Sequence, residues 1–79
     1  MRIRVKLFAT LSRFSKSEYS GAPFEIEIPE GTTIQDLINL LKIPAEEAKI
    51  TFVNGITQPP DYLIKPDDEV GIFPPIGGG

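Results

Sequence analysis

The chain has 79 residues and neither cysteine nor histidine, so it is expected to form one small domain without disulfides, zinc knuckles, thiolate nucleophiles or histidine acid–base pairs. Its formal net charge of −3 argues against nucleic acid as the main ligand, because phosphate binding requires clustered lysine and arginine. No apolar run reaches transmembrane length and residues 1–6 lack the apolar segment of a signal peptide, so we expect a cytoplasmic protein that does not contact membranes.

The first predicted strand covers residues 2–8, where apolar Ile3, Val5 and Leu7 alternate with charged residues. Alternation with a period of two is typical of a strand with one buried and one wet face. Phe8 departs from this pattern, because it falls on the charged face of the strand.

A polar stretch separates this strand from the next one. Residues 10–14 predict a short helical turn and residues 15–22 a loop. Apolar and acidic residues then alternate over residues 24–28, which predicts a second strand. Pro29 ends that strand, because proline has no amide proton to donate to a sheet.

A helix follows, and its start has a local signal. Thr33 and Asp36 have the spacing of a capping box, in which the threonine oxygen satisfies an unpaired amide of the first turn. One apolar face follows with helical spacing, formed by Ile34, Leu37, Ile38 and Leu41. Pro44 forbids continuation of the helix, and residues 45–48 are compatible with one further helical turn.

Three more strands are predicted after the helix. Residues 50–53 are strand-like, and Asn54-Gly55 is the strongest hairpin signal in the sequence, so residues 56–57 begin a short return strand. Residues 62–68 indicate a packed turn region, and residues 69–73 form the last strand.

The order strand, strand, helix, strand, short strand, strand predicts a two-layer α+β domain, because the single amphipathic helix suffices to cover one side of one sheet. The core between sheet and helix is expected to consist of Ile3, Val5, Leu7, Ile26, Ile28, Ile34, Leu37, Ile38, Leu41, Phe52, Val70 and Ile72.

The sequence offers little catalytic chemistry. Its one acidic cluster, Asp67-Asp68-Glu69, lacks the alternating oxygen ligands and the glycine of a calcium loop, so we interpret it as a solvated turn. Lys42, Lys49 and Lys65 are isolated and expected to face solvent. We expect no metal site, no bound cofactor and no self-sufficient active site.

The sequence finishes with Phe73-Pro74-Pro75-Ile76-Gly77-Gly78-Gly79. The two prolines end the last strand at Phe73 and stiffen the segment that follows. Glycines contribute almost nothing to a fold, but a terminus without side chains can enter a narrow channel in a partner protein. The α-carboxylate of Gly79 would become reactive once ATP converts it into an acyl-adenylate. A disordered end or a linker is the alternative interpretation of the tail taken alone.

Several segments together carry a resemblance to a known family. They are Phe-Val-Asn-Gly at residues 52–55, the turn at residues 67–70, the ending at residues 71–79, and Phe8-Ala9 followed by Leu11 and Arg13. They resemble the MoaD family, the small sulfur-carrier subunit of molybdopterin synthase, over essentially the whole chain. Members of that family usually carry glycine where this chain has Asp67, which leaves the geometry of that turn open.

The resemblance implies a ubiquitin-like β-grasp fold. It implies one mixed sheet of four to five strands, covered on one face by the main helix, within a domain at residues 1–74. Residues 75–79 would form a flexible tail. The first and last strands would lie side by side and run parallel.

The resemblance also implies a mechanism. An adenylyltransferase similar to ubiquitin-activating enzymes would use ATP to adenylate Gly79, and sulfur transfer would convert Gly79 into a thiocarboxylate. Gly77 and Gly78 would let the tail thread into the large catalytic subunit of molybdopterin synthase. There the tail would donate sulfur to a pterin precursor of the molybdenum or tungsten cofactor.

Other functions use the same fold and terminus. A sulfur carrier for thiamin or tRNA thiolation has a similar ending, although Phe-Pro-Pro favours the pterin interpretation. A ubiquitin-like modifier would conjugate the same carboxylate to lysine amines. A plain interaction module with an inert tail is a third possibility.

A partner surface is predicted beside the tail. Phe8 and Phe73 each lie on the outward phase of their strand and at its C-terminal end. If those strands are parallel neighbours, the two rings emerge together next to Pro74 and Pro75, and an exposed aromatic pair indicates a binding surface. Ile56, with Thr57, would extend this surface. The alternative is a loop that covers both rings within the monomer.

Overall fold

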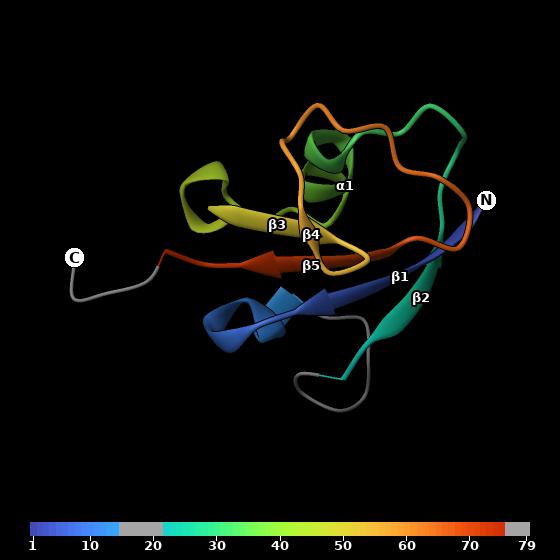
Figure 1. Cartoon of the computed structure of the whole chain (residues 1–79). Coiled ribbons are helices and arrows are strands. Elements are labelled where there is room, and N and C mark those ends of the chain that lie inside the picture. The colour runs from blue at the N-terminus through green and yellow to red at the C-terminus, as the bar shows by residue number, and fades with distance from the viewer. Residues whose placement is uncertain (15–21, 76–79) are drawn as a thin grey trace.

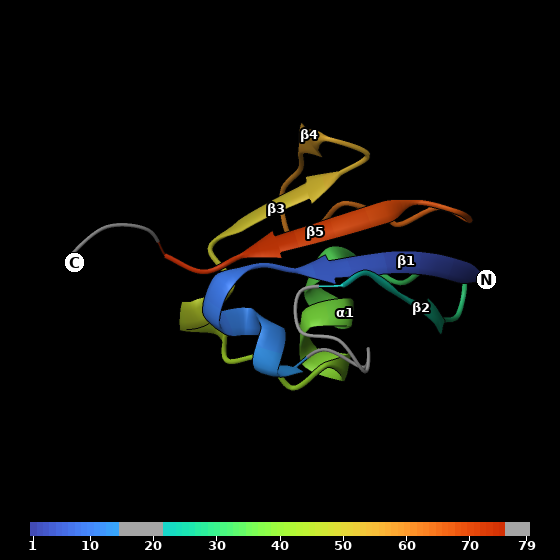
Figure 2. The same cartoon turned by 90° about the horizontal axis from the view of Figure 1, so that it is seen from below.

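The computed structural model describes residues 1–14 and 22–75, which form two layers. One layer is a five-stranded sheet of order β2-β1-β5-β3-β4, and the helix α1 lies against one face of it (Figures 1 and 2). The elements are β1 (Arg2–Leu7), the 3₁₀ helix η1 (Ala9–Phe14), β2 (Phe24–Glu27), α1 (Ile34–Leu40), the 3₁₀ helix η2 (Ala45–Glu47), β3 (Ile50–Val53), β4 (Ile56–Thr57) and β5 (Glu69–Phe73). The predicted α+β class and element order are confirmed, whereas the loop predicted at residues 15–22 falls almost entirely outside the described residues.

The two central strands are β1 and β5, and they run parallel with Val5 opposite Val70 and Leu7 opposite Ile72. The other pairs, β1 with β2, β5 with β3 and β3 with β4, are antiparallel. Because β1 and β5 run in the same direction, both strands finish at the same end of the sheet, opposite the N-terminus (Figure 1). This is the β-grasp arrangement, and the predicted parallel pairing is confirmed.

The helix α1 begins at its predicted capping box. The Asp36 amide donates to Thr33 Oγ1 at 3.1 Å, and the Thr33 amide donates to Asp36 Oδ2 at 3.1 Å. After the helix, Lys42 adopts a φ of 61°, the left-handed conformation that commonly closes a helix, and Pro44 follows.

The hairpin between β3 and β4 also forms where predicted. Asn54 and Gly55 have φ values of 52° and 84°, and positive φ at both central residues is what a two-residue hairpin turn requires. The turn pairs Val53 with Ile56 and Phe52 with Thr57, which fixes the face of the sheet to which each residue belongs.

The core lies between the sheet and α1. Its buried apolar residues are Ile3, Val5, Leu7, Leu11, Phe24, Ile28, Ile34, Leu37, Ile38, Leu41, Ile43, Val53, Ile64, Val70 and Ile72. Ten of the twelve predicted core residues are in this set. Ile26 is only half-buried, because β2 is an edge strand, although it packs against the core.

Phe52 was predicted in the core and this prediction is wrong. Its neighbours Thr51 and Val53 are buried on the face of the sheet that carries α1. Phe52 therefore points to the opposite face, which we call the open face, and is half-buried there. The strand β3, Ile-Thr-Phe-Val, consists of good strand formers and contains no charged residue. Its sequence therefore does not show which of its residues face the core.

The interpretation of Asp67-Asp68-Glu69 as a solvated turn is also wrong at its centre. Asp68 is only 6% exposed, and its carboxylate accepts hydrogen bonds from Asn54 Nδ2 at 2.9 Å, the Lys65 amide at 2.9 Å and the Tyr62 hydroxyl at 3.2 Å. Asp68 therefore joins the hairpin turn to the segment that leads into β5.

The structure also determines the backbone conformation of this turn at Asp67. It adopts a φ of 67°, the left-handed region in which glycine meets no steric penalty. Its amide donates to the Arg2 carbonyl at 2.9 Å. The turn thus keeps a conformation suited to glycine although an aspartate occupies the position.

Candidate functional site

The candidate site begins where β5 finishes. The Lys49 amide donates to the Phe73 carbonyl at 3.0 Å, and Pro74 and Pro75 follow, half-buried and exposed respectively. Neither proline has an amide proton, so the sheet cannot continue through them. Gly77, Gly78 and Gly79, the predicted threading and reactive residues, lie outside the described residues together with Ile76.

Phe8 and Phe73 meet at this end of the sheet, as predicted. Their ring centroids lie 3.9 Å apart and the ring planes differ by 7°, so the two rings are stacked. The Phe8 amide donates to the Ile72 carbonyl at 3.1 Å, which continues the β1–β5 pairing by one residue and holds Phe8 on the outward phase. Both side chains are half-buried.

A third ring, which sequence analysis had placed in the core, joins them. Phe52 meets Phe73 edge-on, with centroids 5.3 Å apart and planes at 71°. Stacked and edge-to-face pairs are the favourable geometries for aromatic rings. We call the three residues Phe8, Phe52 and Phe73 the aromatic patch; it lies on the face of the sheet opposite α1.

Ile56 does not share a face with the aromatic patch. It is 64% exposed, but it pairs with buried Val53, so the register assigns its side chain to the side of the sheet that carries α1. Thr57, which pairs with Phe52, is the β4 residue on the open face. The two-residue Asn54-Gly55 turn fixes which residues pair, but the face that each pair occupies depends on the pairing of β3 with β5.

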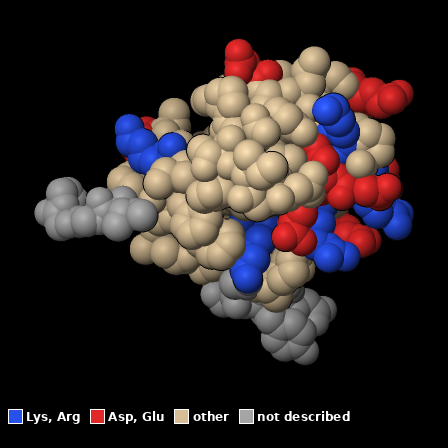
Figure 3. Space-filling view, viewed as in Figure 1, with Lys and Arg blue, Asp and Glu red and all other residues tan. Residues whose placement is uncertain are grey.

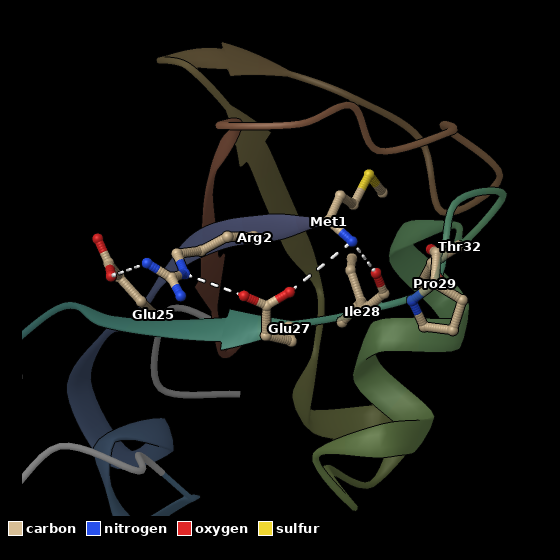
Figure 4. A network of polar contacts seen from close by, with 7 residues as sticks. All are labelled: Met1, Arg2, Glu25, Glu27, Ile28, Pro29 and Thr32. Carbon is tan, nitrogen blue, oxygen red and sulfur yellow. Dashed lines mark hydrogen bonds and ion pairs between the residues drawn. The ribbon is translucent and has the colours of Figure 1, made fainter.

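The other half of the open face is charged. Arg2 lies between Glu25 and Glu27, with nitrogen–oxygen distances of 3.9 and 3.1 Å, and Arg4 lies between Glu25 and Glu69 at 3.9 and 3.7 Å. Figure 4 shows the end of this ladder near the N-terminus, where the Met1 amine also donates to the Ile28 carbonyl at 2.6 Å. In Figure 3, charged side chains gather toward the N-terminal end of the molecule and leave the middle of the face largely uncharged.

These charges are already paired within the domain. Each arginine already contacts two carboxylates, and exposed ion pairs typically contribute only about 0–1 kcal/mol. The open face therefore divides into an aromatic half near the end of β5 and an internally neutralised half near the N-terminus.

Reactive groups are scarce in the described part of the chain. Residues 1–14 and 22–75 contain no group of three or more acidic, histidine or cysteine side chains that would hold a metal. Partial burial raises the pKa of the Tyr62 hydroxyl above its usual range, and the charge of Asp68 and the hydrogen bond to it act in the same direction. This hydroxyl serves the Asp68 network and does not lie in the aromatic patch.

Among residues 1–14 and 22–75, no helix is both long enough and apolar enough to cross a membrane.

Comparisons with known proteins place this geometry in context. The model of the ThiS family matches residues 5–79 of the chain. A solved structure from Pyrococcus furiosus, named "Putative molybdopterin converting factor, subunit 1", is 29% identical with a TM-score of 0.70, over 95% of this chain and 98% of that one.

Two further solved structures come from Haloferax volcanii. SAMP1 is 19% identical with a TM-score of 0.68 over the full length of both chains. A structure of small archaeal modifier protein 1 is 18% identical with a TM-score of 0.70, over 95% of this chain and 98% of that one. At these identities the likeness shows the shared fold alone. No curated protein matches the chain.

Proposed function

Because the chain belongs to the ThiS family of ubiquitin-like small sulfur carriers, we propose that it is the small subunit of a molybdopterin synthase. In this proposal Gly79 carries the sulfur, and the acceptor is a pterin precursor of the molybdenum or tungsten cofactor. The P. furiosus structure supports this choice within the family, since its name refers to molybdopterin and it is 29% identical to this chain.

The proposed chemistry uses the α-carboxylate of Gly79. A carboxylate oxygen attacks the α-phosphorus of ATP, pyrophosphate leaves, and an acyl-adenylate forms. A sulfide donor then attacks the acyl carbon and AMP leaves, which produces a thiocarboxylate. Glycine at the last positions leaves the acyl carbon uncrowded, so both attacks meet little steric hindrance.

The observation that carries the proposal is the position of the aromatic patch. Stacked Phe8 and Phe73 lie on the sheet face opposite α1, at the strand end from which Pro74 and Pro75 lead toward Gly79. A partner that binds these rings would hold the domain at the entrance of its active site, with the tail directed inward. Partly exposed aromatic clusters are typical anchors of protein interfaces.

The proposal involves two partners. The activating partner is an adenylyltransferase similar to ubiquitin-activating enzymes, as the family generally requires. The second partner is the large catalytic subunit, which would supply the side chains that act on the pterin. Neither nucleic acid nor a membrane has a role in the proposal.

A ubiquitin-like modifier is the second candidate function, and the shared fold of the H. volcanii modifiers keeps it open. It would use the same adenylate but give the acyl group to a lysine amine. Thiamin and tRNA thiolation differ from our proposal only in the final sulfur acceptor.

Reconstitution tests the proposal. The full chain is incubated with the activating enzyme of its source organism, ATP and a sulfide donor, and then with the large subunit and pterin precursor. We expect a dithiolene product with wild-type chain and none after deletion of Gly79 or addition of one residue that is verified to remain uncleaved. Lysine conjugates without dithiolene would favour the modifier, and activity of the extended chain would overturn the carrier mechanism.

A further inference from the structure

The turn between β3 and β4 contains a residue pair with a chemistry of its own. In an Asn-Gly sequence the backbone nitrogen of the glycine can attack the side-chain amide carbon of the asparagine, because glycine has no Cβ to shield that nitrogen. Asn54-Gly55 is the one such pair in the chain, since the other asparagine, Asn39, precedes Leu40. A Cβ built on Gly55 would meet nothing within 4 Å, and Asn54 is exposed to water.

The reaction that this pair permits is deamidation. The Gly55 nitrogen loses its proton and forms a bond to Asn54 Cγ, the bond from Cγ to the amide nitrogen breaks, and ammonia leaves with the proton. Water then opens the five-membered imide at either of its carbonyl groups. The products are aspartate and isoaspartate, and isoaspartate lengthens the backbone by one carbon. The reaction needs water alone, and asparagine is accordingly one of the thermolabile residues.

The folded domain holds the Asn54 side chain against the start of β5. Asn54 Nδ2 donates to Asp68 Oδ1 at 2.9 Å, and Asn54 Oδ1 accepts from the Glu69 amide at 2.9 Å. The backbone amide of Asn54 also donates to the Glu69 carbonyl at 2.8 Å. The side chain must therefore release both Asp68 and Glu69 before Cγ can turn toward the Gly55 nitrogen.

Asp68 is a firm anchor for this restraint. It is only 6% exposed, and its carboxylate also accepts from the Lys65 amide at 2.9 Å and the Tyr62 hydroxyl at 3.2 Å. Hydrogen bonds to a charged acceptor are stronger than those between neutral groups. Release of Asn54 consequently requires a local opening of the hairpin turn away from this carboxylate.

We propose that Asn54 is a latent deamidation site and that Asp68 keeps it closed while the domain is folded. Conversion to aspartate replaces the amide donor by a second carboxylate facing buried Asp68, and like charges in one site disfavour each other. Isoaspartate lengthens a turn that only two residues form. Neither product can rebuild the network, so each reacted molecule loses stability permanently.

The rate of deamidation tests the proposal. The full chain is incubated at mildly alkaline pH, either folded or unfolded in urea, and digested with trypsin, which separates Asn39 from Asn54 because Lys42 and Lys49 lie between them. Mass spectrometry then gives the converted fraction at each asparagine. Asn54 should react faster than Asn39 in urea. In the folded chain Asn54 should react at least about a hundredfold more slowly than in urea, because it reacts only from an open form.

Two variants separate a local restraint from overall stability. Asp68→Ala removes the acceptor, and Asn54 should then react about tenfold faster in the folded chain, the factor that corresponds to loss of one hydrogen bond to a charged group. Leu37→Ala weakens the core without touching the turn, because Leu37 lies in α1. Its rate should stay within about twofold of wild type after reaction through global unfolding, measured in urea, is subtracted.

Three results would overturn the proposal: no preference for Asn54 over Asn39 in urea, equal rates for Asn54 in folded and unfolded chain, or equal acceleration by Asp68→Ala and Leu37→Ala after that subtraction. If Asp68→Ala does not fold, Asp68→Asn decides in the same way, because an amide cannot accept all three hydrogen bonds. Asn54→Asp mimics one product and should lower the urea midpoint. An unchanged midpoint would overturn the loss of stability that we assign to deamidation.

Discussion

Phe73→Ala separates the role of the aromatic patch in binding from its role in folding. A fully buried phenylalanine costs about 3–5 kcal/mol when truncated to alanine. Phe73 is half-buried on an open face, so no closed cavity results, and its stacking on Phe8 at 3.9 Å is lost. We therefore expect a loss of about 2 kcal/mol in the free energy of unfolding, equivalent to roughly 10 °C in melting temperature for a domain of this size.

Phe73→Ala should also lower the affinity for the partner. The loss of stability does not account for this change, because the variant still folds at 25 °C. An aromatic anchor at the centre of an interface contributes about 2 kcal/mol or more, which corresponds to about a thirtyfold weaker affinity. The assay is calorimetric titration of the folded variant with the large subunit or the activating enzyme.

Phe14→Ala is the matched control. Phe14 is also a half-buried phenylalanine that packs against the core, but it lies in η1 beside Arg13 and outside the aromatic patch. It should lose comparable stability and keep wild-type affinity. If Phe73→Ala binds within about twofold of wild type, or if both variants lose affinity equally, the patch is not the partner surface.

Four other predictions concern the fold. Leu37→Ala should cost about 2–5 kcal/mol in urea unfolding, since Leu37 is 0% exposed, and a cost below about 0.5 kcal/mol would contradict its place in the core. Asp68→Asn should cost about 2–4 kcal/mol, because an amide cannot accept all three hydrogen bonds; an unchanged urea midpoint would contradict the network. Asp67→Gly should stabilise by about 0.5–1 kcal/mol by removing left-handed strain, and a loss of stability would contradict this reasoning. The raised pKa of Tyr62 means that the folded state holds this proton more tightly than the unfolded state. The contribution of the Tyr62 proton to the free energy of unfolding is therefore complete below the unfolded pKa of about 10 and is lost as pH rises through the folded pKa. The free energy of unfolding of Tyr62→Phe should consequently fall less at alkaline pH than that of the wild type.

Local signals predicted much of this fold from sequence. The Thr33 capping box and the Asn54-Gly55 turn each span only four consecutive residues, and both form as expected. Phe8 and Phe73 were located by combining the phase of two strands with their parallel pairing, and their stacking follows from that geometry.

Features that depend on distant segments were not predictable in this way. Asp68 is buried because donors from Asn54, Tyr62 and Lys65 converge on it, and no short motif encodes that convergence. The phase of Phe52 required the register of the hairpin and of β5, since β3 itself carries no charged residue.

The chemical state of the C-terminus tests the central claim most directly. Mass spectrometry of the intact chain isolated from its source cells, followed by fragmentation, reads the mass of residue 79. We predict a population in which one oxygen of the Gly79 carboxylate is replaced by sulfur, and which disappears in cells lacking the activating enzyme. A terminus that carries only oxygen in both strains, with its sequence intact to Gly79, would contradict the sulfur-carrier account.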